Sequence, residues 1–230
     1  REEFQAHNQE IVTAKVSRVD PETKDAIVEI GKAQEPLFRS EQIPNETLLP
    51  GMLIKVYIAG VADAKEGRRG PRVTISRTHP GLVKRLFESE VPEIYDGTVE
   101  IKAVSREAGS RTKIAVYSAD ENVDAVGACI GPRGARVGKI VDMLYGEKID
   151  IVKYSEDPKE FIAASLAPAD VVSVTIDENA EKSCRVIVPD LQLSLAIGNK
   201  GQNARLAAKL TGWKIDIKPE SGKTDPSVEL

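Results

Sequence analysis

The chain has 230 residues, of which 41% are hydrophobic and 30% are charged. This composition is typical of a soluble globular protein, and the length predicts one to three domains. No apolar segment approaches the roughly 20 residues that a membrane-spanning helix requires, so we expect no membrane partner. The first residues include neither an initiator Met nor an apolar signal segment, which predicts a part of a longer, non-secreted protein.

The charge is unevenly distributed along the chain, although its net value of −4 is unfavourable for a nucleic-acid partner. Residues 131–153 contain five Lys or Arg and three Asp or Glu, a balance of 5 − 3 = +2, and residues 198–218 contain five and one, a balance of 5 − 1 = +4. Exposed charges act over about a Debye length, roughly 8–10 Å, so a local excess matters more than the average. Both segments are therefore candidates for phosphate contact.

Residues 8–78 predict a small β-barrel. Short β-branched or alternating segments are separated by turn residues, among them Asp20-Pro21 and Pro50-Gly51. Five strands at this spacing favour a closed barrel, although the pattern alone also allows an SH3-like barrel or a half-sandwich. The expected strands are 11–19, 26–30, one through Leu37 and Phe38, 52–58 and 73–75, with a hairpin loop at 65–71. Residues 79–92 then predict an amphipathic linker helix that ends at Pro92.

The rest of the chain contains an internal repeat. Ile130-Gly131-Pro132-Arg133-Gly134 recurs as Ile197-Gly198-Asn199-Lys200-Gly201, an offset of 198 − 131 = 67. Lys148-Ile149-Asp150-Ile151 recurs as Lys214-Ile215-Asp216-Ile217, an offset of 214 − 148 = 66. Because the offsets agree within one residue, we infer a duplicated domain. Each copy is expected to contain two strands, a helix, a GxxG loop, a second helix and a third strand. In the first copy, Asn122 is the expected N-cap of the first helix.

A GxxG loop between two helices is suited to phosphate. The second helix begins with unpaired backbone N–H groups and a partial positive charge, and the glycines have no Cβ to keep a sugar-phosphate backbone away. Each loop has a cation at its second variable position, Arg133 or Lys200, and Arg136 and Arg205 follow within about one turn. An isolated GxxG is more often a tight turn between helices, but two matching copies favour phosphate contact. We expect both loops to share one face and to bind one single strand of RNA.

In the order of its motifs the chain resembles the NusA family of bacterial transcription elongation and termination factors. The resemblance covers roughly residues 8–218, and the motifs that carry it include residues 76–80, 131–137, 146–151 and 195–208. It implies a multidomain fold in which an all-β S1-type OB-fold barrel precedes two α+β type II KH domains, each a helix–GxxG–helix packed on a three-stranded sheet. It further implies a cytoplasmic factor that binds A-rich, unstructured nascent RNA and works with RNA polymerase and other elongation or antitermination factors.

These inferences give expected domains and sites. The expected domains are residues 1–7 (end of an N-terminal connector), 8–78 (S1/OB-fold barrel), 79–92 (linker helix), 93–155 (first KH domain), 156–220 (second KH domain) and 221–230 (tail). The predicted RNA-binding residues are Gly131, Pro132, Arg133, Gly134, Arg136, Lys139, Gly198, Asn199, Lys200, Gly201, Gln202, Asn203 and Arg205.

The barrel is expected to bind RNA weakly on its own. Aromatic residues make up only 4% of the chain, and base stacking contributes about 1–3 kcal/mol per base. The barrel offers at most His7, Phe38 and Tyr57 for stacking. The weaker RNA contacts that we expect there are Phe38, Arg68, Arg69 and Arg72.

Other residues have structural explanations. Trp213, Cys129 and Cys184 are expected to pack in cores, and Asp150 and Asp216 to lie on solvated strand faces. No catalytic or nucleotide-binding motif appears, and the two separated cysteines exclude a standard zinc site, so we expect no enzyme activity, cofactor or metal. We also expect a monomer. Two alternatives stay open: an RNA-binding accessory region of an exoribonuclease or exosome-like complex, and a protein–protein scaffold whose loops no longer bind RNA.

Overall fold

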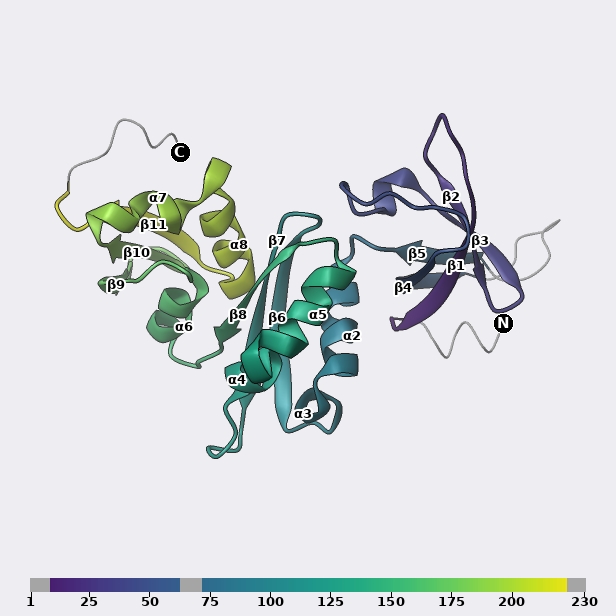
Figure 1. Ribbon diagram of the computed structural model, residues 1–230. Helices are drawn as coiled ribbons and strands as arrows, with labels where there is room; N and C mark the ends of the chain where they lie inside the picture. Colours follow the sequence, from purple (N-terminus) through teal and green to yellow (C-terminus); the bar gives the residue numbers. More distant parts are fainter. Residues whose placement is uncertain (1–8, 63–71, 223–230) are drawn as a thin grey trace. The chain divides into compact units, whose positions relative to one another are not determined.

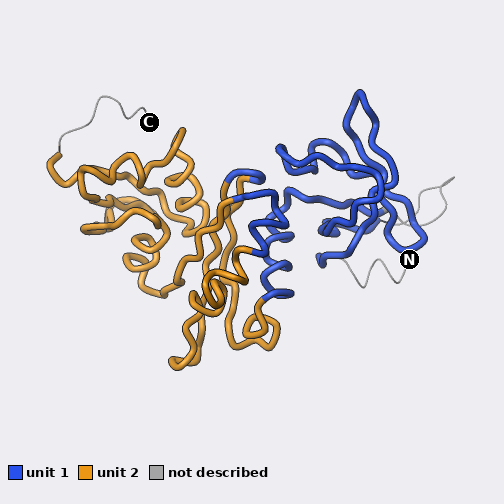
Figure 2. Tube along the Cα trace, in the orientation of Figure 1, with its two compact units in different colours: residues 1–90, 108–110, 139–147 blue, residues 91–107, 111–138, 148–230 orange. Residues whose placement is uncertain are grey.

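A computed structural model describes residues 9–62 and 72–222 (Figure 1). No helix in these ranges is long and apolar enough to cross a membrane. The contacts divide the chain into two compact units, one of residues 1–90, 108–110 and 139–147, the other of residues 91–107, 111–138 and 148–230 (Figure 2). This division passes through the first copy of the repeat, so the domain boundaries expected from the sequence stay predictions.

The first unit contains a five-stranded antiparallel barrel of β1 (Ile11–Val19), β2 (Ala26–Ile30), β3 (Ala33–Leu37), β4 (Leu53–Ala62) and β5 (Arg72–Ser76). The strand order is β3-β2-β1-β4-β5. Alternating small and β-branched residues face inward, for example Ala14 and Val16 on β1 and Val28 on β2, and they form one buried cluster. The two edge strands, β3 and β5, also lie against each other, so the barrel is nearly closed.

A buried ion pair holds the end of the barrel. The Nε and Nη2 groups of Arg77 donate to the Glu46 carboxylate at 2.7–3.0 Å, and the two side chains are only 3% and 0% exposed. Arg77 also donates to the carbonyl oxygens of Lys55, at 2.6 Å, and Met143, at 3.4 Å. Because two charges so deeply buried need hydrogen bonds to offset their desolvation, this cluster fixes the loop around Glu46 against the strands.

Two short helices follow the barrel. Helix α2 (Pro80–Glu90) buries Leu82, Leu86 and Phe87, as its apolar spacing predicts. Pro92 does not end this helix as expected but begins the next one, α3 (Pro92–Tyr95). The first position of a helix suits proline, because the backbone N–H that proline lacks has no partner there.

The predicted duplication is confirmed by two copies of the same topology. In each copy the first two strands are antiparallel, and the strand after the GxxG loop pairs parallel to the second strand. The first copy contains β6 (Val99–Glu107), β7 (Arg111–Ser118), α4 (Ala125–Ile130), η2 (Pro132–Gly134), α5 (Ala135–Met143) and β8 (Lys148–Lys153). The second contains β9 (Ser173–Ile176), β10 (Ser183–Val188), η3 (Asp190–Gln192), α7 (Leu193–Ile197), η4 (Asn199–Gly201), α8 (Gln202–Thr211) and β11 (Lys214–Pro219).

One local expectation in the first copy was wrong. Helix α4 begins after Asp124 rather than after Asn122, and the Asp124 side chain makes no capping hydrogen bond. The preceding residues form a turn instead, in which the backbone N–H of Asn122 donates to the Asp120 carboxylate at 2.9 Å. Competition between such turns and helix caps is common for Asp and Asn.

The two copies pack together within the second unit. Helix α8 contacts β6 and β7 of the first copy (Figure 1), and helix α6 (Pro158–Ser165) contacts β8. Ala115 and Val152 of the first copy share a buried cluster with Phe161 on α6 and Leu210 on α8. The tandem arrangement is therefore held by a small apolar core as well as by the connecting chain.

A buried lysine adds a polar contact to this junction. The Nζ group of Lys113 donates to the Ala167 carbonyl at 2.7 Å and to the Asp150 carboxylate at 2.9 Å, and Arg111 pairs with the same carboxylate. Burial lowers the pKa of Lys113, and Asp150 opposes that shift. Asp150 is only 17% exposed, which corrects the expectation that it lies on a solvated face, whereas Asp216 is 53% exposed.

The remaining core predictions hold. Cys129 and Cys184 are buried, and burial raises the pKa of their thiols to about 12 and about 11, respectively. Thiols with such pKa values stay protonated near neutral pH and act as small apolar groups. Trp213 packs against the core of the second copy.

Removing one partner of the buried ion pair tests its role in the barrel. The Glu46→Gln variant leaves the Arg77 charge buried without its counter-ion, so we expect the free energy of unfolding to fall by about 3–5 kcal/mol. Glu88→Gln breaks the more exposed pair between Arg85 and Glu88, whose side chains are both 30% exposed, and should cost about 1 kcal/mol or less. Urea denaturation of both variants measures the difference, and equal losses would contradict the assigned role.

Candidate nucleic-acid interface

The two GxxG loops have the same backbone conformation. The φ and ψ angles are 74° and 172° at Gly131 and 80° and 170° at Gly198, a combination that in practice only glycine adopts. The cation between the glycines is left-handed in both copies, with φ of 55° at Arg133 and 52° at Lys200. The second glycine has a φ of 74° in each loop. The repeat in sequence is thus a repeat in local geometry.

The first glycine is also required by packing. A Cβ atom on Gly131 would lie 2.6 Å from Cγ of Arg136, and one on Gly198 would lie 2.7 Å from the backbone nitrogen of Asn203. Each glycine is therefore covered by the residue five positions later. The second glycines have more room, since a Cβ atom at Gly134 meets nothing within 4 Å.

Only some backbone amides of the loops are available to a ligand. The N–H of Gly134 donates to the Gly131 carbonyl, and the N–H of Gly201 donates to the Gly198 carbonyl, both at 3.1 Å. Among the residues that the structure describes, the N–H groups of Arg133, Asn199 and Lys200 have no hydrogen-bond acceptor. These amides lie on exposed residues and offer hydrogen-bond donors to an anion.

The cations predicted to contact RNA fall into two groups. Arg133 and Lys200 are exposed and form no ion pair with any residue in the described ranges. The other three are each paired with a glutamate: Arg136 with Glu93 at 2.9 Å, Lys139 with Glu90 at 3.1 Å, and Arg205 with Glu107 at 2.7 Å. No sequence pattern indicates these glutamates, because they lie about 40 to 100 residues from their partners in the chain.

Arg136 and Asn203 occupy equivalent positions and brace the loops. Arg136 donates to the Ala128 carbonyl at 2.7 Å, and the Asn203 amide donates to the carbonyls of Ala196, at 2.9 Å, and Leu166, at 3.1 Å. Asn203 is 4% exposed, so a direct RNA contact of its side chain, as predicted, is not supported. Both residues tie the start of the second helix to the end of the first.

The remaining predicted contacts vary in exposure. Pro132 and Asn199 are exposed, and Gln202 is half-buried at the start of α8. On the barrel, Phe38 is 45% exposed, whereas Tyr57 is only 7% exposed and stacks on His79 with ring centroids 4.5 Å apart. Tyr57 is therefore not available for base stacking. His7, Arg68 and Arg69 lie outside the described residues, and Arg72 begins β5.

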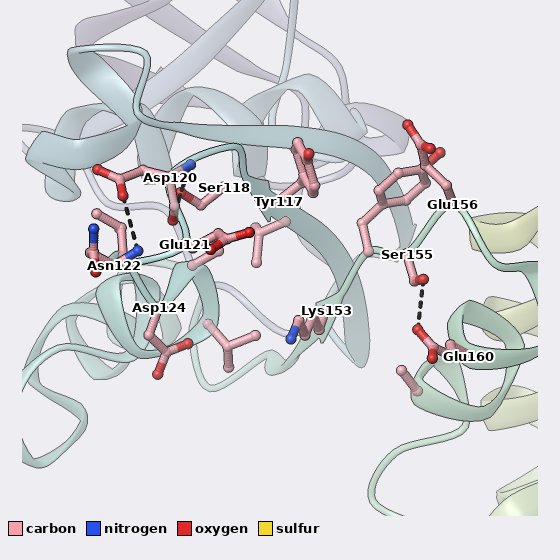
Figure 3. Close-up of a pocket in the computed structure, with 16 residues that line it drawn as sticks. Tyr117, Ser118, Asp120, Glu121, Asn122, Asp124, Lys153, Ser155, Glu156 and Glu160 are labelled. Carbon is pink, nitrogen blue, oxygen red and sulfur yellow. Dashed lines mark hydrogen bonds between the residues drawn. The ribbon is translucent and has the colours of Figure 1, made fainter.

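A cavity of about 760 Å³ in the second unit has the wrong charge for RNA. It lies beside the ends of β7 and β8 and the start of α4, and Glu121, Asp124 and Glu156 stand around it with Lys153 (Figure 3). Asp120 and Glu160 bring the carboxylates to five against this one lysine. Phosphate would be repelled there, so we place the candidate RNA contacts at the glycine loops.

The two glycines of a loop should differ in their tolerance of a side chain. Gly201→Ala places an alanine in a left-handed conformation that is unfavourable for it, so we expect the free energy of unfolding to fall by about 1–2 kcal/mol. Gly198→Ala adds the clash with the Asn203 backbone and should lower the free energy of unfolding by distinctly more. Chemical denaturation of the two variants measures the difference, and a larger loss for Gly201→Ala would refute the packing role of the first glycine.

Comparison with known proteins agrees with this geometry. Residues 77–154 match the NusA-like first KH domain, and residues 158–225 match the NusA-like second KH domain. The chain is 57% identical over 219 residues to the transcription termination/antitermination protein NusA of Bacillus subtilis (strain 168), covering 95% of this chain and 57% of that protein. The protein of the same name from Halalkalibacterium halodurans is also 57% identical over 219 residues, with 95% and 56% covered.

A mycobacterial relative is covered over more of its length. The transcription termination/antitermination protein NusA of Mycobacterium tuberculosis (strain ATCC 25618 / H37Rv) is 48% identical over 237 residues, covering 98% of this chain and 67% of that protein. The chain spans slightly more than half the length of the Bacillus and Halalkalibacterium relatives. With matches to both KH domains and this extent of identity, the chain belongs to the NusA family.

Proposed function

We propose that this chain is the single-stranded RNA-binding region of a transcription elongation, termination and antitermination factor, and that it contacts nascent RNA near RNA polymerase. The observation that carries the proposal is the pair of glycine loops with nearly the same backbone angles, each with an exposed cation at its tip. The backbone N–H groups of Arg133 in the first loop, and of Asn199 and Lys200 in the second, have no acceptor among the described residues. The names of the relatives in this family, which refer to transcription termination and antitermination, support the cellular role.

The loops are suited to the backbone of an RNA strand. A phosphate oxygen accepts hydrogen bonds from backbone N–H groups, and Arg133 or Lys200 supplies the opposite charge. Glycines without side chains allow the sugar-phosphate chain to approach closely. KH modules of this kind clamp about four unpaired nucleotides, whereas a shallow loop has nothing to insert into a duplex.

One strand is proposed to pass over both loops. The apolar cluster of Ala115, Val152, Phe161 and Leu210 packs the copies against each other, which limits the distance between the loops. A strand bound at one loop therefore meets the other at high effective concentration, which often raises affinity 10²-fold or more. The barrel contributes less, because Phe38 is the only one of its predicted stacking residues that is both described and exposed.

The wider role is also part of the proposal. We infer a cytoplasmic, monomeric, non-enzymatic protein whose other parts contact RNA polymerase and further elongation or antitermination factors. Family membership favours this role over an accessory region of an exoribonuclease or exosome-like complex. Incubation with labelled single-stranded RNA separates the two, since the transcription factor leaves the RNA at full length.

Reversing the charge at the tip of the second loop tests the site. Lys200→Asp should weaken binding to an A-rich single-stranded RNA by roughly tenfold at low salt, because one charge-assisted contact is lost. The slope of log K against log salt should fall by about 0.7 per lost phosphate contact. Lys182→Asp is a matched control, since Lys182 is exposed and also left-handed, with a φ of 46° against 52° at Lys200.

Lys200→Asp and Lys182→Asp change the net charge equally, so a difference between them reports the loss of a local RNA contact. The control variant should bind RNA within about twofold of the parent, because Lys182 lies in the turn between β9 and β10 and not in a glycine loop. Equal weakening by both substitutions, or no weakening by Lys200→Asp, would contradict the proposed site. Absence of any RNA binding by the parent at low salt would favour the protein scaffold instead.

A further inference from the structure

Glu107 of the first copy reaches a cation of the second copy. Its carboxylate accepts from Nη2 of Arg205 at 2.7 Å and from Nε at 3.1 Å, a two-point pairing of carboxylate and guanidinium. The Nη1 group of the same arginine donates to the Lys200 carbonyl at 2.9 Å. Glu107 ends β6 and Arg205 lies on α8, so the contact joins the first copy directly to the second glycine loop.

The ion pair of Arg205 and Glu107 lies beside the second glycine loop, where its charges act on an RNA strand that approaches the loop. Arg205 is bonded to the tip residue of the loop, and its side chain remains 44% exposed, while that of Glu107 is 29% exposed. These three hydrogen bonds use three of the five N–H donors of the Arg205 guanidinium. A phosphate that reaches Lys200 therefore meets a neutralised arginine and a nearby carboxylate rather than a second free cation.

We propose that Glu107 sets the RNA affinity of the second KH module by competing with phosphate for Arg205. In the free protein the carboxylate holds the guanidinium, and an RNA phosphate must share or displace it. Glu107 is thus an affinity-determining residue supplied by one copy of the repeat to the other. The inference deepens the proposed function and rests on it.

A purely structural role for this ion pair is less favourable on physical grounds. The backbone of the second loop is already closed by hydrogen bonds from Gly201 to Gly198 and from Gln202 to Asn199. The copies are held together by the apolar cluster that includes Phe161 and Leu210. Ion pairs as exposed as this one contribute little to stability, so its loss should leave the fold intact and free a cation for RNA.

The Glu107→Gln variant tests the competition, because it removes the charge and keeps the shape. We expect the affinity for an A-rich single-stranded RNA to rise by about fivefold at low salt, the size of one exposed charge–charge interaction. The salt slope should steepen by about 0.7, as for one more phosphate contact. Glu100→Gln is the matched control, since Glu100 lies on the same strand, pairs with Lys102 at 3.0 Å and is 57% exposed.

A double-mutant cycle completes the test. In an Arg205→Met background, Glu107→Gln should change the RNA affinity by less than about twofold, because no guanidinium remains to be released. A lower affinity for Glu107→Gln, with unchanged thermal stability, would show that the pair positions the loop and would overturn the proposal. An equal rise in RNA affinity for Glu107→Gln and Glu100→Gln would show that only the net charge matters, and it would also overturn the proposal.

The same series separates this inference from the proposed function. If the parent binds RNA and Lys200→Asp weakens binding while Glu107→Gln has no effect, only the competition is refuted. If the parent does not bind RNA at low salt, the proposed function itself fails.

Discussion

The candidate site depends on one backbone constraint, a reversal between two helices that only glycine permits at its first position. The φ of about 74–80° and ψ of about 170–172° at Gly131 and Gly198 end the first helix of each copy and turn the chain into the GxxG loop. The same turn leaves the residue between the glycines left-handed and exposed, so that Arg133 and Lys200 project from the tips. Since the arrangement occurs twice with nearly identical angles, it is a property of the motif and not of one local environment.

The charge available to a phosphate depends on which cations are already paired with a carboxylate. Counting cations along the chain predicts a local positive excess in residues 131–153 and 198–218, yet Arg136, Lys139 and Arg205 are each paired with a glutamate. Arg133 and Lys200 are the cations of the predicted site that lack such a partner among the described residues. With few free cations, the proposed RNA site would have a modest salt dependence. The proposed linkage of its two loops by one strand would add affinity.

Much of the fold could be predicted from the sequence, and the failures have physical causes. The repeat offset of 66–67 residues and the glycine positions gave the duplicated topology, because local backbone requirements fix those residues. The ion pairs from Glu93 and Glu107 could not be predicted, since they depend on how distant segments pack. The burial of Asn203 and the low exposure of Asp150 were not predicted for the same reason, since polar residues in an amphipathic pattern are normally expected to face solvent. The role of Tyr57 could not be predicted either, because an aromatic residue on a barrel strand can stack on an RNA base or, as it does here, on His79.

The most direct test of the central claim is an NMR titration of the isotopically labelled protein with one A-rich single-stranded RNA long enough to span both loops. The backbone amide signals of Arg133, Asn199 and Lys200 should shift strongly and reach saturation together at one equivalent of RNA, because these N–H groups are the donors proposed for phosphate. Saturating binding that leaves the amide signals of both loops unmoved would contradict the account.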